Sequence, residues 1–210
     1  MTEQERMLSG QLYNAGDPEL AEKRLRAKEL CRRFNDAPAA DTAGREAVLR
    51  QLLGKMGEGC WIEPPFRCDY GSQVSLGDHV YANYDCIFLD VAPITIGSHV
   101  FLGPRVSLFA AGHPLDAGVR DLELEFGRPI TIGNSVWLGG NVTVLAGVTI
   151  GDGTVVAAGS VVTKDLPAGV VAAGNPCRVL RAITEDDRAV WEARLAAYEA
   201  GKETGPAIFP

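Results

Sequence analysis

A period of six residues runs through the middle of this chain and restricts the folds available to it. An aliphatic residue occurs at every sixth position without a slip, and glycines punctuate several of the turns between these positions. One aliphatic residue per six predicts short strands joined by turns, and three such units make a triangular coil of about eighteen residues. The positions are Ile132, Leu138, Val144, Ile150, Val156 and Val162.

Residues one coil apart stack on each other in such a fold, at about one strand spacing of ~4.8 Å. The pairs expected to stack are Ile132 with Ile150, Leu138 with Val156, and Val144 with Val162. Each inward aliphatic side chain then contributes roughly 1.5–3 kcal/mol by burial. A β-sandwich with coincidental spacing is the alternative, but six consecutive positions in register disfavour it. We predict a mainly-β fold, a parallel β-helix over residues 59–182.

The same spacing continues upstream at Ile96, Leu102 and Leu108, and it is interrupted once, between Leu108 and Ile130. The interrupting segment reads FAAGHPLDAGVRDLELEFGRP and contains His113. A long loop in an otherwise compact repeat is often functional. This segment is therefore the first place to look for a catalytic group.

Helical patterns flank the repeat. Asp17-Pro18 has the form of an N-cap followed by proline at the first helical position, and a second helix is expected from about Asp41 to a stop at Gly54. Residues 1–58 are thus predicted to be an N-terminal helical cap. Residues 183–210 are predicted to be a C-terminal helical tail, with a helix over 183–199 that Thr184 or a nearby aspartate caps, and irregular structure from 200 onward.

Composition excludes several kinds of partner. A net charge of −7 disfavours nucleic acid and anionic membranes, although a local basic patch could hold a phosphorylated ligand. The N-terminus lacks a secretory signal pattern, and no apolar run reaches the ~18 residues needed to span a bilayer. The five cysteines form no CxxC pair, so neither a disulfide framework nor a zinc site is indicated. We expect a cytoplasmic protein with reduced thiols.

Several stretches resemble the maltose and galactoside O-acetyltransferases. They are FRCDYG (66–71), YANYD (81–85), GHP (112–114), ITIGNSVWLGGNVTVLAGVTIGDG (130–153), SVVTKD (160–165) and AAGNPCRVLR (172–181), and GQLYNAGDPEL is similar to that family's helical cap. The resemblance covers about residues 5–182. It implies a left-handed β-helix, a homotrimer with active sites between neighbouring subunits, acetyl-CoA as donor without a metal, and a sugar hydroxyl as acceptor.

The resemblance also implies that His113 is the catalytic base. An alcohol is a poor nucleophile while protonated, and histidine, which titrates near neutral pH, can take its proton and pass it to the departing thiolate. The alternative interpretation of His113 is an exposed loop histidine. His79 and His99 each occupy the third position after the aliphatic residue of a hexad, and they are expected to be exposed turn residues.

Four polar residues match acceptor-binding positions of the family. Asn83 can donate to and accept from sugar hydroxyls, or it can satisfy a turn. Asp17 has a rival role as the helix N-cap. Asp69 has the maltose-type identity, and Glu125 is equally well explained as a partner of His113 or the sugar and as a solvated loop charge. With Val91 where the galactoside type has aspartate, the pattern predicts that glucose or maltose is preferred over galactosides.

A further set aligns with the family's coenzyme A channel. The backbone N–H of Gly140 is the candidate donor to the oxyanion of the tetrahedral intermediate, and basic side chains suit the coenzyme phosphates. The set consists of Trp137, Gly140, Ala158, Thr163, Lys164, Arg178 and Arg181.

Three other functions stay open at this point. They are a hexapeptide acyltransferase acting on a non-sugar hydroxyl or an amine, a zinc enzyme of the carbonic-anhydrase kind, and a non-catalytic scaffold. The zinc enzyme needs three histidine ligands, and the three histidines of this chain are not spaced one coil apart. The scaffold does not account for His113 together with the basic residues that match the coenzyme channel.

Overall fold

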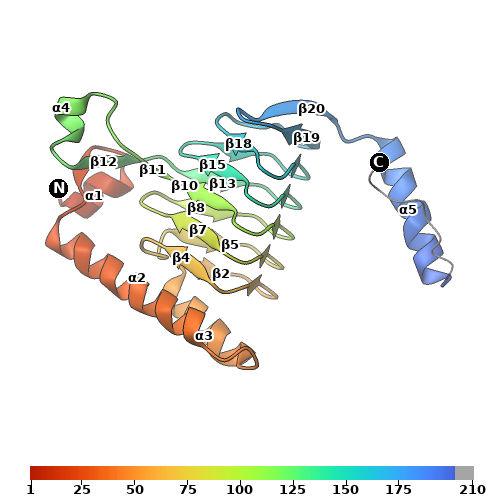
Figure 1. Ribbon diagram of the computed structural model, residues 1–210, viewed down its shortest axis with the longest axis horizontal. Helices are drawn as coiled ribbons and strands as arrows, with labels where there is room; N and C mark the ends of the chain where they lie inside the picture. Colours follow the sequence, from red (N-terminus) through yellow and green to blue (C-terminus); the bar gives the residue numbers. More distant parts are fainter. Residues whose placement is uncertain (202–210) are drawn as a thin grey trace.

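Three sheets of parallel strands form the sides of the coil, as the repeat predicts, and the second of them ends in one antiparallel strand. The computed structural model describes residues 1–201, and Figure 1 shows the coils stacked on helices at the N-terminal end. The first sheet contains β2 (Lys55–Met56), β5 (Val74–Leu76), β8 (Ile94–Ile96), β13 (Ile130–Ile132) and β16 (Thr149–Ile150). The second sheet contains β3 (Trp61–Ile62), β6 (Tyr81–Ala82), β9 (Phe101–Leu102), β14 (Trp137–Leu138), β17 (Val155–Val156), β19 (Val170–Ala173) and β20 (Arg178–Ala182). Its antiparallel strand is β20, which lies beside β19. The third sheet contains β4 (Phe66–Cys68), β7 (Cys86–Leu89), β10 (Ser107–Phe109), β15 (Thr143–Leu145) and β18 (Val161–Val162).

The predicted aliphatic stack forms the core. Ile132 pairs with Ile150, Leu138 with Val156 and Val144 with Val162 in the parallel ladders. All six side chains are at most 1% exposed. The parallel β-helix predicted from the period of six is therefore confirmed, in the predicted register.

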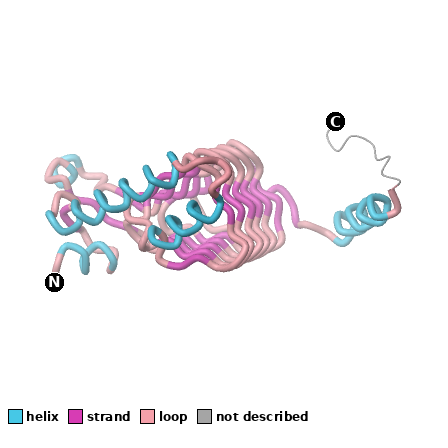
Figure 2. The backbone as a smooth tube through the Cα atoms, turned by 90° about the horizontal axis from the view of Figure 1, so that it is seen from below, coloured by secondary structure: helices cyan, strands magenta, loops and turns pink. Residues whose placement is uncertain are grey.

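Two of the N-terminal helices close the open end of the first coil. The N-terminal helices are α1 (Glu3–Leu8), α2 (Pro18–Asp36) and α3 (Thr42–Leu52), and Figure 2 shows α2 and α3 crossing the end of the coil stack. The first helix, α1, packs instead on the strands β1 (Tyr13–Asn14) and β12 (Leu124–Gly127). Phe34 and Leu49 belong to the same buried cluster as the β-helix core. Asn35 fixes α2 to the third sheet, because its side chain donates to the Phe66 carbonyl at 3.0 Å and accepts from the Phe66 N–H at 2.8 Å.

The helix starts follow their predicted caps. Asp17 caps α2 and Asp41 caps α3, while α3 ends with Leu53 as C-cap, directly before Gly54. At Gly54 the backbone passes very close to the backbone at Ser72, which leaves no room for a side chain. A Cβ atom there would lie 2.2 Å from the Ser72 carbonyl oxygen.

The segment that interrupts the repeat is folded. It contains β11 (Ala111–Gly112), α4 (Ala117–Arg120) and β12 (Leu124–Gly127), and β12 lies between β11 and the N-terminal strand β1 (Tyr13–Asn14) in a small antiparallel sheet. Residues from the N-terminal cap therefore hold the loop that carries His113.

The C-terminal helix α5 (Glu185–Glu199) begins at the predicted cap, Thr184, with Asp187 completing a capping box. Figures 1 and 2 both show α5 standing clear of the coils. Its residues Trp191, Leu195 and Tyr198 are 54%, 55% and 69% exposed. The irregular structure expected from residue 200 falls almost wholly outside the described residues. Within residues 1–201 no helix is long and apolar enough to cross a bilayer.

The two turn histidines lie in exposed turns, as predicted, but the expectation that they are not spaced one coil apart is wrong. The strands that precede them pair Leu76 with Ile96, so the twenty residues between them make one coil. His79 and His99 are exposed, and both have left-handed backbone conformations with φ of 55° and 58°. Their rings stack with centroids 4.9 Å apart. The turn assignment of both histidines is confirmed.

Candidate active site

His113 lies beside Glu125 in the small antiparallel sheet. The pairing of Gly112 with Phe126 brings the start of the loop against its end, and His113 Nε2 lies 4.0 Å from Glu125 Oε1. The His113 side chain is 55% exposed, so a substrate can reach it, whereas that of Glu125 is 24% exposed. An imidazole next to a carboxylate can accept a proton and have the resulting positive charge stabilised.

Tyr13 fixes the Glu125 carboxylate. Tyr13 pairs directly with Glu125 across β1 and β12, and its hydroxyl donates to Glu125 Oε2 at 2.7 Å. Tyr13 is 1% exposed, and burial together with this hydrogen bond raises the pKa of its phenol. The sequence pattern assigned the segment around Tyr13 only to the helical cap, so the contact of Tyr13 with Glu125 was not predicted. The one available signal was that the segment itself resembles the family.

Asp69 lies close enough to Glu125 for the two carboxylates to influence each other. Burial, and then the charge of Glu125, raise the pKa of Asp69, while Arg24 and Lys28 lower it. Arg24 also donates to the Tyr70 hydroxyl at 2.7 Å. A hollow of about 470 Å³ beside this group is lined by Gly16, Arg24, His113, Arg120 and Glu125, among others. The structure thus brings His113 and Glu125 to one hollow, whereas Asp69, whose pKa Glu125 affects, lines a separate hollow with Lys28.

The turn that presents Asp69 is organised by Asp90, a residue that the sequence analysis did not single out. Asp90 is fully buried and accepts hydrogen bonds from the backbone N–H groups of Tyr70 at 2.9 Å, Asp69 at 3.1 Å and Gln73 at 3.2 Å. Burial raises the pKa of Asp90 to about 6, and the backbone hydrogen bonds offset part of that effect.

Asp17 caps helix α2, which is the role that the sequence pattern predicts as the alternative to acceptor binding. Its Oδ1 accepts from the N–H groups of Glu19 at 3.0 Å and Leu20 at 3.3 Å, which is the N-cap of α2. Gly16, directly before it, borders the hollow next to His113. The second carboxylate oxygen leaves room for both roles.

The predicted oxyanion donor lies at a different corner of the coil, in the turn of residues 139–142 between the second and third sheets. We call this turn, together with the turns stacked on it in neighbouring coils, the Gly140 corner. Glycine is required here because a Cβ atom on Gly139 would lie 2.6 Å from the Ala158 nitrogen of the next coil. The Gly140 carbonyl accepts from the Gly159 N–H at 2.9 Å. Within residues 1–201 the N–H groups of Gly140 and Ala158 have no hydrogen-bond acceptor, so both can donate to a ligand.

Asn83 lies in the same column of turns as Gly103 and Gly139, because the strands that precede these three residues pair in register. Its side-chain oxygen accepts from the Tyr84 N–H at 2.8 Å, so Asn83 does satisfy a turn. Trp137 stands beside this corner with 52% of its surface exposed.

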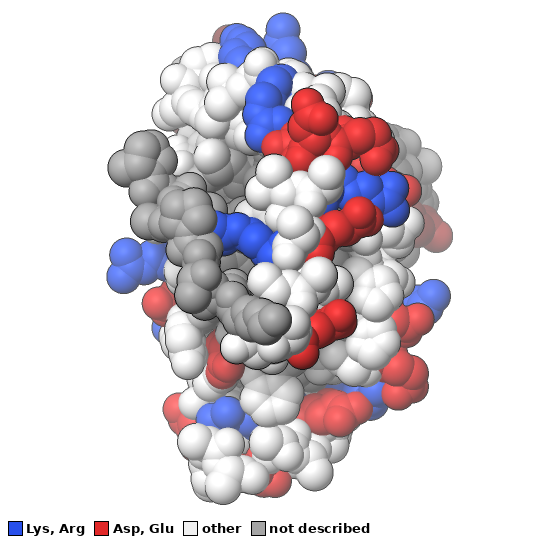
Figure 3. All heavy atoms as spheres, turned by 90° about the vertical axis from the view of Figure 1, so that its right-hand side faces the viewer, with Lys and Arg blue, Asp and Glu red and all other residues white. Residues whose placement is uncertain are grey.

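The basic residues of the predicted coenzyme channel are already partly paired. Arg181 on β20 forms a bidentate ion pair with Asp187 of α5, at 2.6 Å and 2.9 Å. Arg178 donates to the Cys177 carbonyl at 2.8 Å. Figure 3 looks onto this C-terminal side and shows basic side chains interspersed with acidic ones.

Most of the predicted residues divide between two edges of the third sheet, whereas Arg178 and Arg181 lie on β20 of the second sheet. Asn83, Trp137, Gly140 and Ala158 lie at the Gly140 corner, where the chain enters that sheet. The loop with His113 follows β10, and Thr163 and Lys164 follow β18, so these residues lie at the opposite edge, which we call the His113 corner. One chain therefore does not bring the catalytic base and the oxyanion donor together.

Comparison with known proteins identifies the family. Residues 6–57 match the maltose acetyltransferase hexapeptide capping motif, and residues 129–164 match the bacterial transferase hexapeptide family of six repeats. The galactoside O-acetyltransferase of Escherichia coli strain K12 is 42% identical over 184 residues, covering 88% of this chain and 91% of the relative.

Two solved structures extend the comparison. A maltose O-acetyltransferase from Clostridium difficile 630 is 49% identical with a TM-score of 0.87, covering 88% of this chain and 98% of the other. A hexapeptide-repeat acetyltransferase from Vibrio cholerae O1 biovar eltor, complexed with acetyl coenzyme A, is 40% identical with a TM-score of 0.82, covering 88% and 100%. The chain is therefore an acetyl-CoA-dependent acetyltransferase that belongs to the maltose and galactoside O-acetyltransferase family.

Proposed function

We propose that the protein transfers an acetyl group from acetyl-CoA to a sugar hydroxyl, with His113 as general base. The observation that carries this proposal is the exposed imidazole of His113, 4.0 Å from a carboxylate that Tyr13 holds in place. The imidazole takes the hydroxyl proton as the sugar oxygen attacks the thioester carbonyl. The tetrahedral oxyanion faces the free N–H of Gly140, and the proton then passes to the coenzyme sulfur as the carbon–sulfur bond breaks.

Two chains share each site in this proposal, and three chains form a closed ring. The division of residues between the two corners supports this shared site. The acceptor-binding residues and the coenzyme-binding residues are each found partly at one corner and partly at the other. Asn83 is separated from Asp69 and Glu125, as Gly140 is from Thr163 and Lys164. When the His113 corner of one chain faces the Gly140 corner of its neighbour, both sets are complete.

The acceptor is a sugar in this proposal because the site combines carboxylates, which accept hydrogen bonds, with an amide that can both accept and donate. Asp69, Glu125 and the Asn83 amide can bind several hydroxyls at once. Val91 is apolar and 3% exposed, so it contributes no carboxylate, and we expect glucose or maltose to be preferred over galactosides. Lys164, Arg178 and Arg181 are the proposed partners of the coenzyme phosphates, without a metal. The five free thiols support a cytoplasmic location.

An acceptor panel tests the proposal. Purified protein with acetyl-CoA is offered glucose, maltose, a thiogalactoside and an amino sugar, and free coenzyme thiol and acetylated products are measured. We expect ester formation on glucose or maltose with the highest kcat/KM. A higher kcat/KM for the thiogalactoside would contradict the predicted preference, and amide products alone would favour an amine acceptor.

A further inference from the structure

A line of aromatic side chains follows the outer face of the second sheet. Trp61, Tyr81, Phe101 and Trp137 pair with one another in register, one per coil, and we call these four residues the aromatic stripe. Trp61, Phe101 and Trp137 are 40%, 55% and 52% exposed, and the rings of Tyr81 and Phe101 lie 6.4 Å apart between centroids. Of the aromatic side chains in the described coils, the exposed ones all belong to this stripe or to Tyr84 beside it.

The fold itself does not require this stripe. The residues that alternate with it point inward and form the core. The equivalent outward positions of the first sheet carry polar side chains, which are Lys55, Ser75, Thr95, Thr131 and Thr149. Coils of the same geometry are therefore built without aromatic residues outside. The third sheet carries a less exposed outward column of Leu89, Phe109 and Leu145. The continuous strip of exposed aromatic rings on the second sheet indicates a binding surface.

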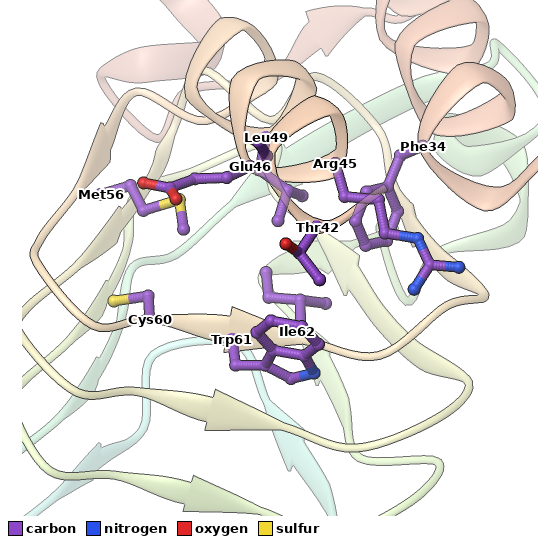
Figure 4. Close-up of a pocket in the computed structure, with 10 residues that line it drawn as sticks. Phe34, Thr42, Arg45, Glu46, Leu49, Met56, Cys60, Trp61 and Ile62 are labelled. Atoms are coloured by element: carbon purple, nitrogen blue, oxygen red, sulfur yellow. The ribbon is translucent and has the colours of Figure 1, made fainter. Parts of the chain in front are cut away.

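The stripe runs through the proposed site and beyond it. Asn83 follows Tyr81 on the same coil, and Gly140 follows Trp137, so the upper part of the stripe borders the Gly140 corner. At its lower end, Trp61 borders a pocket of about 200 Å³ between α3 and the first coil. Figure 4 shows Thr42 and Glu46 of α3 opposite the strand that carries Trp61, so polar groups are available at that end.

We propose that the aromatic stripe binds the remaining residues of an extended oligosaccharide whose reacting sugar lies at the Gly140 corner. This inference rests on the proposed function. A β-1,4-linked glucose chain is a straight ribbon with C–H groups on both faces of each ring, and these groups pack on the electron-rich faces of aromatic rings. Neighbouring coils are ~4.8 Å apart, close to the length of one sugar residue in such a chain. Because Trp137 belongs to the proposed coenzyme channel, the oligosaccharide meets Trp61, Tyr81 and Phe101. These three residues span two coil steps, about 10 Å, which accommodates about two sugars beyond the reacting one.

Acceptor length provides the test. We measure kcat/KM at saturating acetyl-CoA for glucose, cellobiose and cellotriose, with wild type, Trp61→Ala, Trp61→Phe and the control Trp191→Ala. Trp191 is a matched control because it is 54% exposed and lies on α5. Each added sugar that meets an aromatic ring should raise kcat/KM about three- to tenfold. Trp61→Ala should remove the gain of cellotriose over cellobiose, because Trp61 is the aromatic residue farthest from the Gly140 corner. Trp61→Phe should keep most of this gain, and Trp191→Ala should behave as wild type.

The possible failures are distinguishable. Equal kcat/KM for glucose and cellotriose, or a gain of cellotriose over cellobiose that Trp61→Ala retains, overturns the role of the stripe and leaves the proposed function intact. Absence of transfer to any sugar overturns the proposed function and this inference with it. A lower molar mass of Trp61→Ala in light scattering assigns the stripe to contacts between subunits and also overturns the inference.

Discussion

Asp90 makes the stability of this protein depend on pH in a direction opposite to that of most carboxylates. Burial raises its pKa from 3.8 to about 6, and this outweighs the hydrogen bonds it accepts from three backbone N–H groups. Between about pH 4 and pH 6 the Asp90 carboxyl group is therefore protonated in the folded state and ionised in the unfolded state. Stability from this group is complete below about pH 4 and is lost as the pH rises through about 6. The gap between the two pKa values corresponds to about 3 kcal/mol.

The substitution Asp90→Asn isolates this effect, because asparagine keeps an acceptor oxygen in the same shape but does not ionise. We expect the free energy of unfolding of wild type, relative to Asp90→Asn, to fall by about 2–3 kcal/mol between pH 4 and pH 7. Urea titrations of both proteins at one protein concentration measure it. A difference that stays constant across this range, or that changes in favour of wild type, would refute the reasoning.

Three further predictions concern the site. Tyr13→Phe removes the hydrogen bond that holds Glu125, and kcat should fall about three- to tenfold at little cost in melting temperature; an unchanged kcat would show that Glu125 needs no such support. Asp187→Asn releases Arg181 from its bidentate ion pair, so Arg181 becomes available to the coenzyme phosphates. The Kd for coenzyme A, measured by calorimetry, should fall a few-fold, and an unchanged or higher Kd would remove Arg181 from the phosphate site. Light scattering at micromolar concentration should give the mass of three chains, whereas a monomeric mass would remove the shared site.

The β-helix could be predicted because its information is local and repeated. A single aliphatic residue every six positions sets both the inward side and the register, so Ile132 and Ile150 meet without any knowledge of the rest of the chain. Helix starts were equally local, since Asp17 and Asp41 cap their helices through bonds within a few residues.

The support of the candidate site could not be predicted, because it depends on contacts between distant segments. Tyr13 and Glu125 are 112 positions apart and meet only because β1 joins the loop in an antiparallel sheet. Asp90 is one of 27 acidic residues, and nothing around it in the sequence shows that it accepts backbone hydrogen bonds from the previous coil. The division of the site between two corners follows from the coil geometry, which a linear alignment of site residues does not display.

The most direct test of the catalytic proposal is the turnover of His113→Ala with glucose or maltose as acceptor. General-base catalysis typically supplies ~10²–10⁴-fold in rate, so kcat should fall by about that range. The affinity for acetyl-CoA and the melting temperature should change little, since the His113 side chain is 55% exposed and takes no part in the aliphatic core. A variant that keeps more than about a tenth of the wild-type kcat, with chemistry shown to limit the rate, would contradict the assignment of His113 as the base.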